Sequence, residues 1–239
     1  MHIKGLWRYP VKSLAGEALD QADITRNGIT GDRIVHVRGD RGPLTGRTRS
    51  QLLTLRARTG PDGQPTVEGH PWRSPEAAGL VRHHGGQDAR LVSFTGGERF
   101  DVLPLLVATD GAVREFGHDV RRLRPNLLIG GVPELSERDW PGHALRIGSV
   151  VIGIHSLRGR CVVTTIDPDS GAQDLDVFRH IRRRFDGELA LNCWVIEPGQ
   201  VAVGDPVELI TAKAQPADIG GWIVGAPYHV DEPPFAARP

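Results

Sequence analysis

Apolar and polar side chains alternate over residues 2–11, where Ile3, Trp7, Tyr9 and Val11 fall on one face. A repeat of two residues is the spacing of a β-strand with one buried face. Short apolar or β-branched runs follow along the chain, separated by turn-forming pairs such as Asn27-Gly28. The pattern predicts a mainly β protein with a few helices, an α+β class. Further strands are expected at residues 34–38, 52–57, 80–82, 91–94, 103–108, 127–129, 189–196 and near 210, with three more within 144–166.

Two helices are predicted by a change of period and by capping residues. Thr109 or Asp110 is suited to cap a short helix that runs through Phe116. Asp174 or Asp176 is suited to cap a second helix, because apolar residues follow it at spacings of three and four. Those apolar residues are Leu175, Phe178, Ile181 and Phe185.

Composition and charge narrow the class of protein. The chain has 239 residues, with 29 basic and 29 acidic side chains, and this balance gives no reason to expect a nucleic acid or an anionic membrane as partner. Thirty glycines and eighteen prolines fit many turns between short strands. No long apolar run is present, and two cysteines without an export signal predict a reducing, cytoplasmic setting.

One stretch, at residues 160–171, combines an arginine, a cysteine and a turn. It reads RCVVTTIDPDSG, which predicts a strand entered at Cys161 and left through a tight turn. A lone cysteine is most often a small core residue, which is how we interpret Cys193 in the middle of an alternating run. The neighbours of Cys161 favour a different interpretation.

The stretch resembles the MOSC domain family, which is named for the C-terminal domain of molybdenum-cofactor sulfurases. The family segment has Arg-Cys, an apolar pair, two threonines, Asp-Pro and a glycine, as residues 160–171 do. Four other segments match in the family's order: YPVKS at residues 9–13, GDR at 31–33, RPN at 124–126 and VGDPV at 203–207. The two-part organisation resembles bacterial reductases of N-hydroxylated compounds and the mitochondrial amidoxime reducing component.

The resemblance implies a MOSC-type β-barrel preceded by a smaller β-barrel-like domain. We place the N-terminal domain at residues 1–100, the MOSC domain at 101–211 and a C-terminal tail at 212–239, packed through Trp222 and Ile223. Residues 61–100 give the weakest pattern, and His83-His84 are interpreted as part of an exposed loop because no third ligand lies at a metal-site spacing.

The resemblance also implies a cofactor, a pterin phosphate whose two sulfurs hold molybdenum. Cys161 is the candidate metal ligand and catalytic residue, since a soft thiolate suits a sulfur-rich metal centre. Cations and hydrogen-bond donors would hold the phosphate, and an amide would suit the pterin edge. The implied cofactor-binding residues are Lys12, Ser13, Arg33, Thr109, Arg124, Asn126 and Arg160. Alone, Lys12 would be interpreted as a surface lysine, and Thr109 keeps its alternative role as a helix cap.

Three functions remain open at this stage. The first is a molybdopterin-dependent oxidoreductase that reduces N-hydroxylated or other N–O compounds. The second is a carrier of the cofactor, or a sulfur-transfer protein with a persulfide on Cys161, and the third is a MOSC-like fold that only binds a partner. Two cysteines cannot hold a ferredoxin-type cluster, and we find no nucleotide fingerprint, flavin site or pyridoxal-phosphate domain. Electrons would therefore come from a separate electron-transfer protein.

Overall fold

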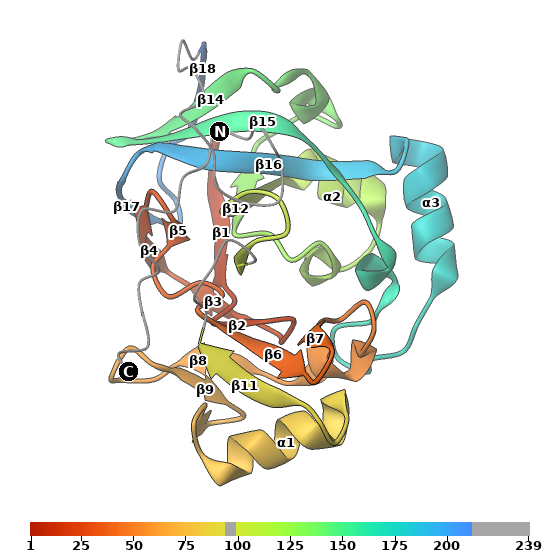
Figure 1. The fold of residues 1–239 in the computed structure, drawn as a ribbon. Helices are drawn as coiled ribbons and strands as arrows, with labels where there is room; N and C mark the ends of the chain where they lie inside the picture. The colour runs from red at the N-terminus through yellow and green to blue at the C-terminus, as the bar shows by residue number, and fades with distance from the viewer. Residues whose placement is uncertain (94–98, 212–239) are drawn as a thin grey trace.

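A computed structural model describes residues 1–93 and 99–211, and its centre is an eight-stranded sheet (Figure 1). Segments from both ends of the chain enter this sheet, because β1 pairs with β13 and β18 pairs with β14. From edge to edge the strands are β18 (Glu208–Thr211), β14 (His143–Ile147), β15 (Val150–Gly159), β16 (Glu188–Glu197), β12 (Leu105–Thr109), β13 (Leu127–Gly130), β1 (His2–Arg8) and β3 (Glu17–Leu19).

Three small sheets complete the strands of the described residues. One consists of β11 (Arg90–Ser93), β6 (Val35–Gly39) and β2 (Val11–Lys12), with β7 (Gly42–Leu44) on β6. The second holds β10 (His70–Pro71), β9 (Pro65–Val67) and β8 (Ala57–Thr59). The third holds β17 (Gly199–Ala202), β4 (Gln21–Thr25) and β5 (Gly28–Ile29). The mainly β class is confirmed, and the large sheet is an open ladder with β18 and β3 at its edges.

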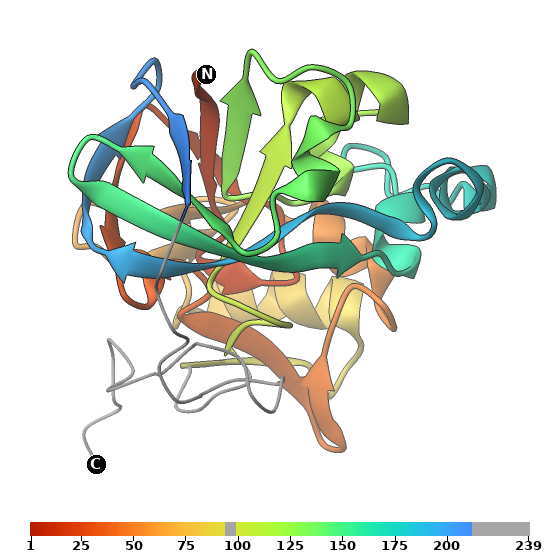
Figure 2. The same ribbon diagram turned by 90° about the horizontal axis from the view of Figure 1, so that it is seen from above.

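Within residues 1–93 and 99–211, three α-helices lie outside the sheets. Helix α1 (Pro75–Gly85) packs at the end of the molecule opposite β14 and β18, whereas α2 (Asp110–Phe116) follows β12 directly (Figure 1). Seen from above, β15 and β16 run side by side across the molecule, and α3 (Leu175–Phe185) lies at one end of them (Figure 2). Both predicted helix caps are confirmed, because the Thr109 side chain accepts from the Ala112 N–H and the Asp174 side chain from the Asp176 N–H.

The described residues contain four short 3₁₀ helices, η1 (Ser50–Thr54), η3 (Val120–Arg122), η4 (Ser136–Asp139) and η5 (Val162–Thr165). Two of them, η1 and η5, replace strand at predicted positions. Residues 52–57 are thus a 3₁₀ turn followed by β8, and residues 144–166 contain two strands rather than three. The predicted first strand, 2–11, is also divided between β1 and β2.

The region of residues 74–86 is a larger correction, because the strand expected at 80–82 and the loop expected at His83-His84 belong to α1. The Ser74 side chain caps this helix by accepting from the Ala77 N–H, Pro75 stands at its first turn and Gly86 ends it. A serine followed by proline is a helix start signal. The glycine-rich composition of this region obscured that signal.

Three separate apolar clusters form the core of the described residues. One joins β1, β4 and the strands of the large sheet, and a second lies under α1 around β6, η1 and β9. A third packs α2 and α3 against the sheet. The tail assigned to 212–239, with Trp222 and Ile223, lies outside the described residues, as does Phe94. No helix among the described residues combines the length and the apolar character needed to cross a membrane.

Candidate functional site

Cys161 is the N-cap of the 3₁₀ helix η5, two residues beyond the end of the long strand β15, and it is partly exposed. The Thr164 hydroxyl donates to the Cys161 carbonyl at 2.9 Å, and the Thr165 hydroxyl donates to the Val162 carbonyl at 2.6 Å. Such local hydroxyl bonds compete with strand pairing. The prediction of a strand over residues 162–166 is therefore wrong, and the two threonines shape the turn behind the cysteine.

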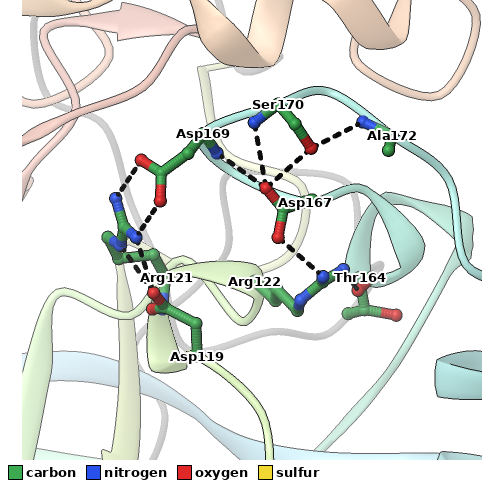
Figure 3. A network of polar contacts seen from close by, with 8 residues as sticks. All are labelled: Asp119, Arg121, Arg122, Thr164, Asp167, Asp169, Ser170 and Ala172. Carbon is green, nitrogen blue, oxygen red and sulfur yellow. Dashed lines mark hydrogen bonds and ion pairs between the residues drawn. The ribbon is translucent and has the colours of Figure 1, made fainter.

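The turn that follows η5 is held by two arginines of η3 (Figure 3). Arg122 donates to the Asp167 carboxylate at 3.0 Å and to the Thr164 carbonyl at 3.5 Å. Arg121 makes two hydrogen bonds to the Asp169 carboxylate, at 2.8 and 2.7 Å. A distant segment therefore fixes the loop that carries Cys161.

Cys161 opens onto a cavity with about 890 Å³ of empty space, part of it continuous with solvent. We call it the cysteine cavity. The fold brings to it residues about 150 positions apart in sequence, because β2, the turn before β6, the segment before β13 and the end of β15 converge there. The predicted residues that line it are Lys12, Ser13, Arg33, Arg124, Asn126, Arg160 and Cys161.

Unusual backbone marks three of these residues. Ser13, Arg33 and Arg124 have φ angles of 72°, 54° and 57°, in the left-handed region that residues other than glycine rarely adopt. Such conformations have a cost and gather at functional sites. In each case the local chain turns so that a polar side chain lines the cavity.

A buried network around Asp32 orients Arg33. Asp32 is fully buried, accepts from the Tyr9 N–H at 2.7 Å and forms an ion pair with Arg33. The Asn126 amide nitrogen donates to Asp32 and to the Trp7 carbonyl, each at 3.3 Å. Both N–H donors of Asn126 are thereby used within the protein, so this amide supports Arg33.

Tyr9 lies against both guanidinium groups. The Arg33 and Arg124 guanidinium carbons are 5.0 and 4.3 Å from the Tyr9 ring centroid, and the Tyr9 hydroxyl donates to the Pro125 carbonyl at 3.1 Å. Burial raises the pKa of Tyr9 to about 12, so the ring stays neutral. A neutral aromatic face favours cations above it.

Sequence reasoning missed three charged residues of the cavity. Asp101 pairs with Lys12 at 3.1 Å, with Arg158 at 3.3 Å and with Arg47 at 3.4 Å. Burial alone would raise the pKa of Asp101, but these cations overcome it and lower that pKa to about 2. A signal existed for Arg158, which stands two residues before Arg160 at the end of a strand, and none existed for Arg47 or Asp101.

The cysteine cavity is strongly cationic, although the whole chain has no net charge. Among the described residues that line it, Asp101 is the only carboxylate. The cations are Lys12, Arg33, Arg47, Arg124, Arg158 and Arg160. Burial lowers the pKa of Lys12, Arg124 and Arg158, and it lowers that of Arg160 to about 10. Cations withdrawn from water with so little compensation form a site for an anion.

Arg160 has unused hydrogen-bonding capacity. Its Nη2 donates to the Leu123 carbonyl at 2.8 Å, whereas its Nε is buried without a partner among the described residues. An unsatisfied buried donor is costly. A ligand acceptor in the cysteine cavity would remove that cost.

Thr109 is not brought to this cavity. The residue is fully buried at the start of α2, where its hydroxyl accepts from the Ala112 N–H at 3.2 Å and donates to Glu137 at 3.1 Å. Both functions of the hydroxyl are therefore used by the helix cap and its buried neighbour. The structure supports the capping role of Thr109 and does not bring this residue to the cysteine cavity.

Comparison with known families identifies the class of protein to which the chain belongs. The MOSC domain matches residues 82–208, and the MOSC N-terminal beta barrel domain matches residues 1–83. The chain belongs to the MOSC domain family. The boundary that we placed at residue 100 remains a prediction.

Particular relatives match different shares of the chain. The mouse mitochondrial amidoxime-reducing component 1 is 26% identical over 280 residues, which cover 87% of this chain and 82% of the relative. A molybdenum cofactor sulfurase of Bombyx mori is 30% identical over 97 residues, 41% of this chain and 12% of the sulfurase. The crystal structure of the YuaD protein from Bacillus subtilis shares the fold, with a TM-score of 0.50 at 15% identity, covering 89% of this chain and 96% of that one.

Proposed function

We propose that this chain binds a molybdenum–pterin cofactor in the cysteine cavity and reduces N-hydroxylated or other N–O compounds. The observation that carries the proposal is the partly exposed Cys161 at a cavity lined by six cations and one described carboxylate. Relatives named as amidoxime-reducing components support the same class of substrate.

The side chains of the cavity fit the cofactor. Cys161 supplies the soft sulfur ligand that a sulfur-rich metal centre favours. Arg33 and Arg124, pre-positioned by Asp32 and Tyr9, suit a phosphate because guanidinium groups bind phosphate oxygens in pairs. Lys12 and Ser13 add a cation and a hydroxyl, and Arg160 offers its unpaired Nε.

Two predicted residues take altered parts in this proposal. Asn126 positions Arg33 through Asp32, because its two N–H donors are already used. Thr109 is left out, since its hydroxyl serves the α2 cap. Asp101 holds Lys12, Arg47 and Arg158 in place as a charged carboxylate.

The reaction balances with an external donor. Reduction of a hydroxylamine, R–NHOH, consumes two electrons and two protons and gives R–NH₂ and water, with cleavage of the N–O bond. The bound metal centre would supply this two-electron oxygen removal, while the chain binds and orients the cofactor. We propose that a separate one-electron-transfer protein delivers the electrons.

Metal analysis and an anaerobic assay test the proposal. Protein from a host that makes the cofactor should retain about one molybdenum per chain. It should oxidise reduced viologen when a model amidoxime is added, and it should be inactive with NAD(P)H alone. Molybdenum-loaded protein that does not oxidise reduced viologen would contradict the reductase proposal.

A second candidate is a carrier or sulfur-transfer role, favoured by the exposure of Cys161 and the similarity to a sulfurase segment. It predicts that the cofactor passes to an apo-acceptor enzyme, or that Cys161 takes up a cyanide-releasable sulfur. Cofactor transfer without turnover would favour this candidate. Turnover with firmly retained molybdenum would favour the reductase.

A further inference from the structure

A second cavity lies beside the cysteine cavity and shares Leu53, Arg124 and Val163 with it. It has about 1160 Å³ of empty space, part of it open to solvent, and we call it the arginine cavity. The side chains that give it character are Trp7, Arg56, Arg58, Arg121, Arg122 and Asp169. The proposed function uses none of them.

Two of its arginines are uncommitted. Arg56 and Arg58 stand two residues apart at β8, so both belong to the same side of the strand. Both are exposed, and neither guanidinium forms an ion pair or hydrogen bond within the described ranges, 1–93 and 99–211. The Arg56 and Arg58 side chains, which line the arginine cavity, are therefore available to a ligand.

The segment η3 contributes an organised set of charges to the same cavity. Arg121 pairs with Asp119 and Asp169 at 2.6 and 2.7 Å, and Arg122 pairs with Asp167 at 3.0 Å (Figure 3). Those three carboxylates outnumber the two η3 arginines, but Arg56, Arg58 and the buried Arg124 add three further cations. With five arginines and three carboxylates, the local balance is positive.

The composition of the walls indicates the class of ligand. Guanidinium groups from two sides can hold a phosphoryl group bidentately. The partly buried Trp7 and the buried Tyr9 provide an aromatic surface beside them. A small ligand with a phosphate and a planar or apolar body satisfies both.

We propose that the arginine cavity is a second anion site, which binds a small organic phosphate between Arg56 and Arg58 on one side and Arg121 and Arg122 on the other. Trp7 forms the wall against which the rest of the ligand lies. The inference is independent of the proposed function, because binding here can be measured without turnover.

Titration calorimetry with pyrophosphate tests the site. We expect saturable binding to the full chain, weakened about tenfold or more by Arg56→Gln with Arg58→Gln, since a bond to a charged group contributes roughly 1.5–3 kcal/mol. Arg47→Gln reports separately on pyrophosphate held in the cysteine cavity. The matched control is Arg26→Gln, which removes an exposed arginine that lines neither cavity. This control should leave the pyrophosphate affinity within about twofold of the wild type.

Tryptophan fluorescence gives a second measurement. Pyrophosphate should change the emission of the wild type, and Trp7→Phe should abolish most of that change while leaving calorimetric binding measurable. If the double variant melts early, Arg58→Gln alone is measured. Absence of saturable binding, equal affinity in the double variant, or loss of affinity only in Arg47→Gln would overturn the proposal.

Discussion

The two cysteines, Cys161 and Cys193, lie in contrasting environments, one beyond the end of the eight-stranded sheet and one within it. Cys193 lies in the middle of β16, fully buried, with Leu105 and Ile154 opposite it on the neighbouring strands. Cys161 lies just beyond the end of β15, partly exposed, at a cavity with six cations. One thiol faces an apolar core, and the other faces a charged opening.

The difference shows that strand position sorts residues of one type into separate roles. In the middle of a central strand, both neighbours supply apolar packing, and burial raises the pKa of the Cys193 thiol. At the strand end, loops from several elements converge and bring cations with them. Cys161 is consequently the thiol suited to chemistry, while Cys193 fills the core.

The largest expected effect comes from removing the Cys161 thiol. Cys161→Ala should remove turnover with reduced viologen almost completely, because the proposed metal ligand is lost. Cys193→Ala is the matched control and should retain both molybdenum and turnover. Equal turnover in the wild type and in Cys161→Ala would contradict the ligand assignment.

This contrast was partly visible in the sequence. The alternation around Cys193 predicted its buried strand, and the local caps predicted α2 and α3. The run of β-branched residues after Cys161 predicted a strand that does not form, because the Thr164 and Thr165 hydroxyls donate to the carbonyls three residues earlier. Propensity alone does not show when a side chain competes with the strand ladder.

The site shows the same limit. Family motifs predicted six cofactor residues besides Cys161 that the structure brings to the cysteine cavity, whereas Thr109, predicted with them, does not line it. Arg47 and Asp101 belong to segments with no periodic pattern or motif, so only folding reveals that they meet Lys12. Long-range charge pairing carries no local signature.

An effect of intermediate size is expected when the two thiols are modified chemically. In protein without cofactor, iodoacetamide at pH 8 should modify Cys161 while leaving Cys193 unmodified until the protein unfolds, as measured by peptide mass spectrometry. The thiolate is the reacting form, and burial both hides Cys193 and disfavours its thiolate. Modification of Cys193 at a comparable rate in folded protein would contradict the assigned burial.

The smallest expected effect concerns the stability of the core. Cys193→Ala should lower the free energy of unfolding by about 1 kcal/mol near neutral pH, since a small buried group is lost from a packed sheet. Because burial raises the pKa of this thiol above its ordinary value of 9.0, the unfolded chain releases the proton first as the pH rises. The contribution of Cys193 is therefore complete below pH 9.0 and falls as the pH rises above it.

Urea unfolding of the wild type and of Cys193→Ala at pH 7 and pH 10 measures the difference in unfolding free energy between them, with Cys161→Ala as the control. The stability gap should narrow or reverse at pH 10 by about 1.4 kcal/mol, and a gap unchanged between the two pH values would show that Cys193 is not shielded from water as the fold indicates.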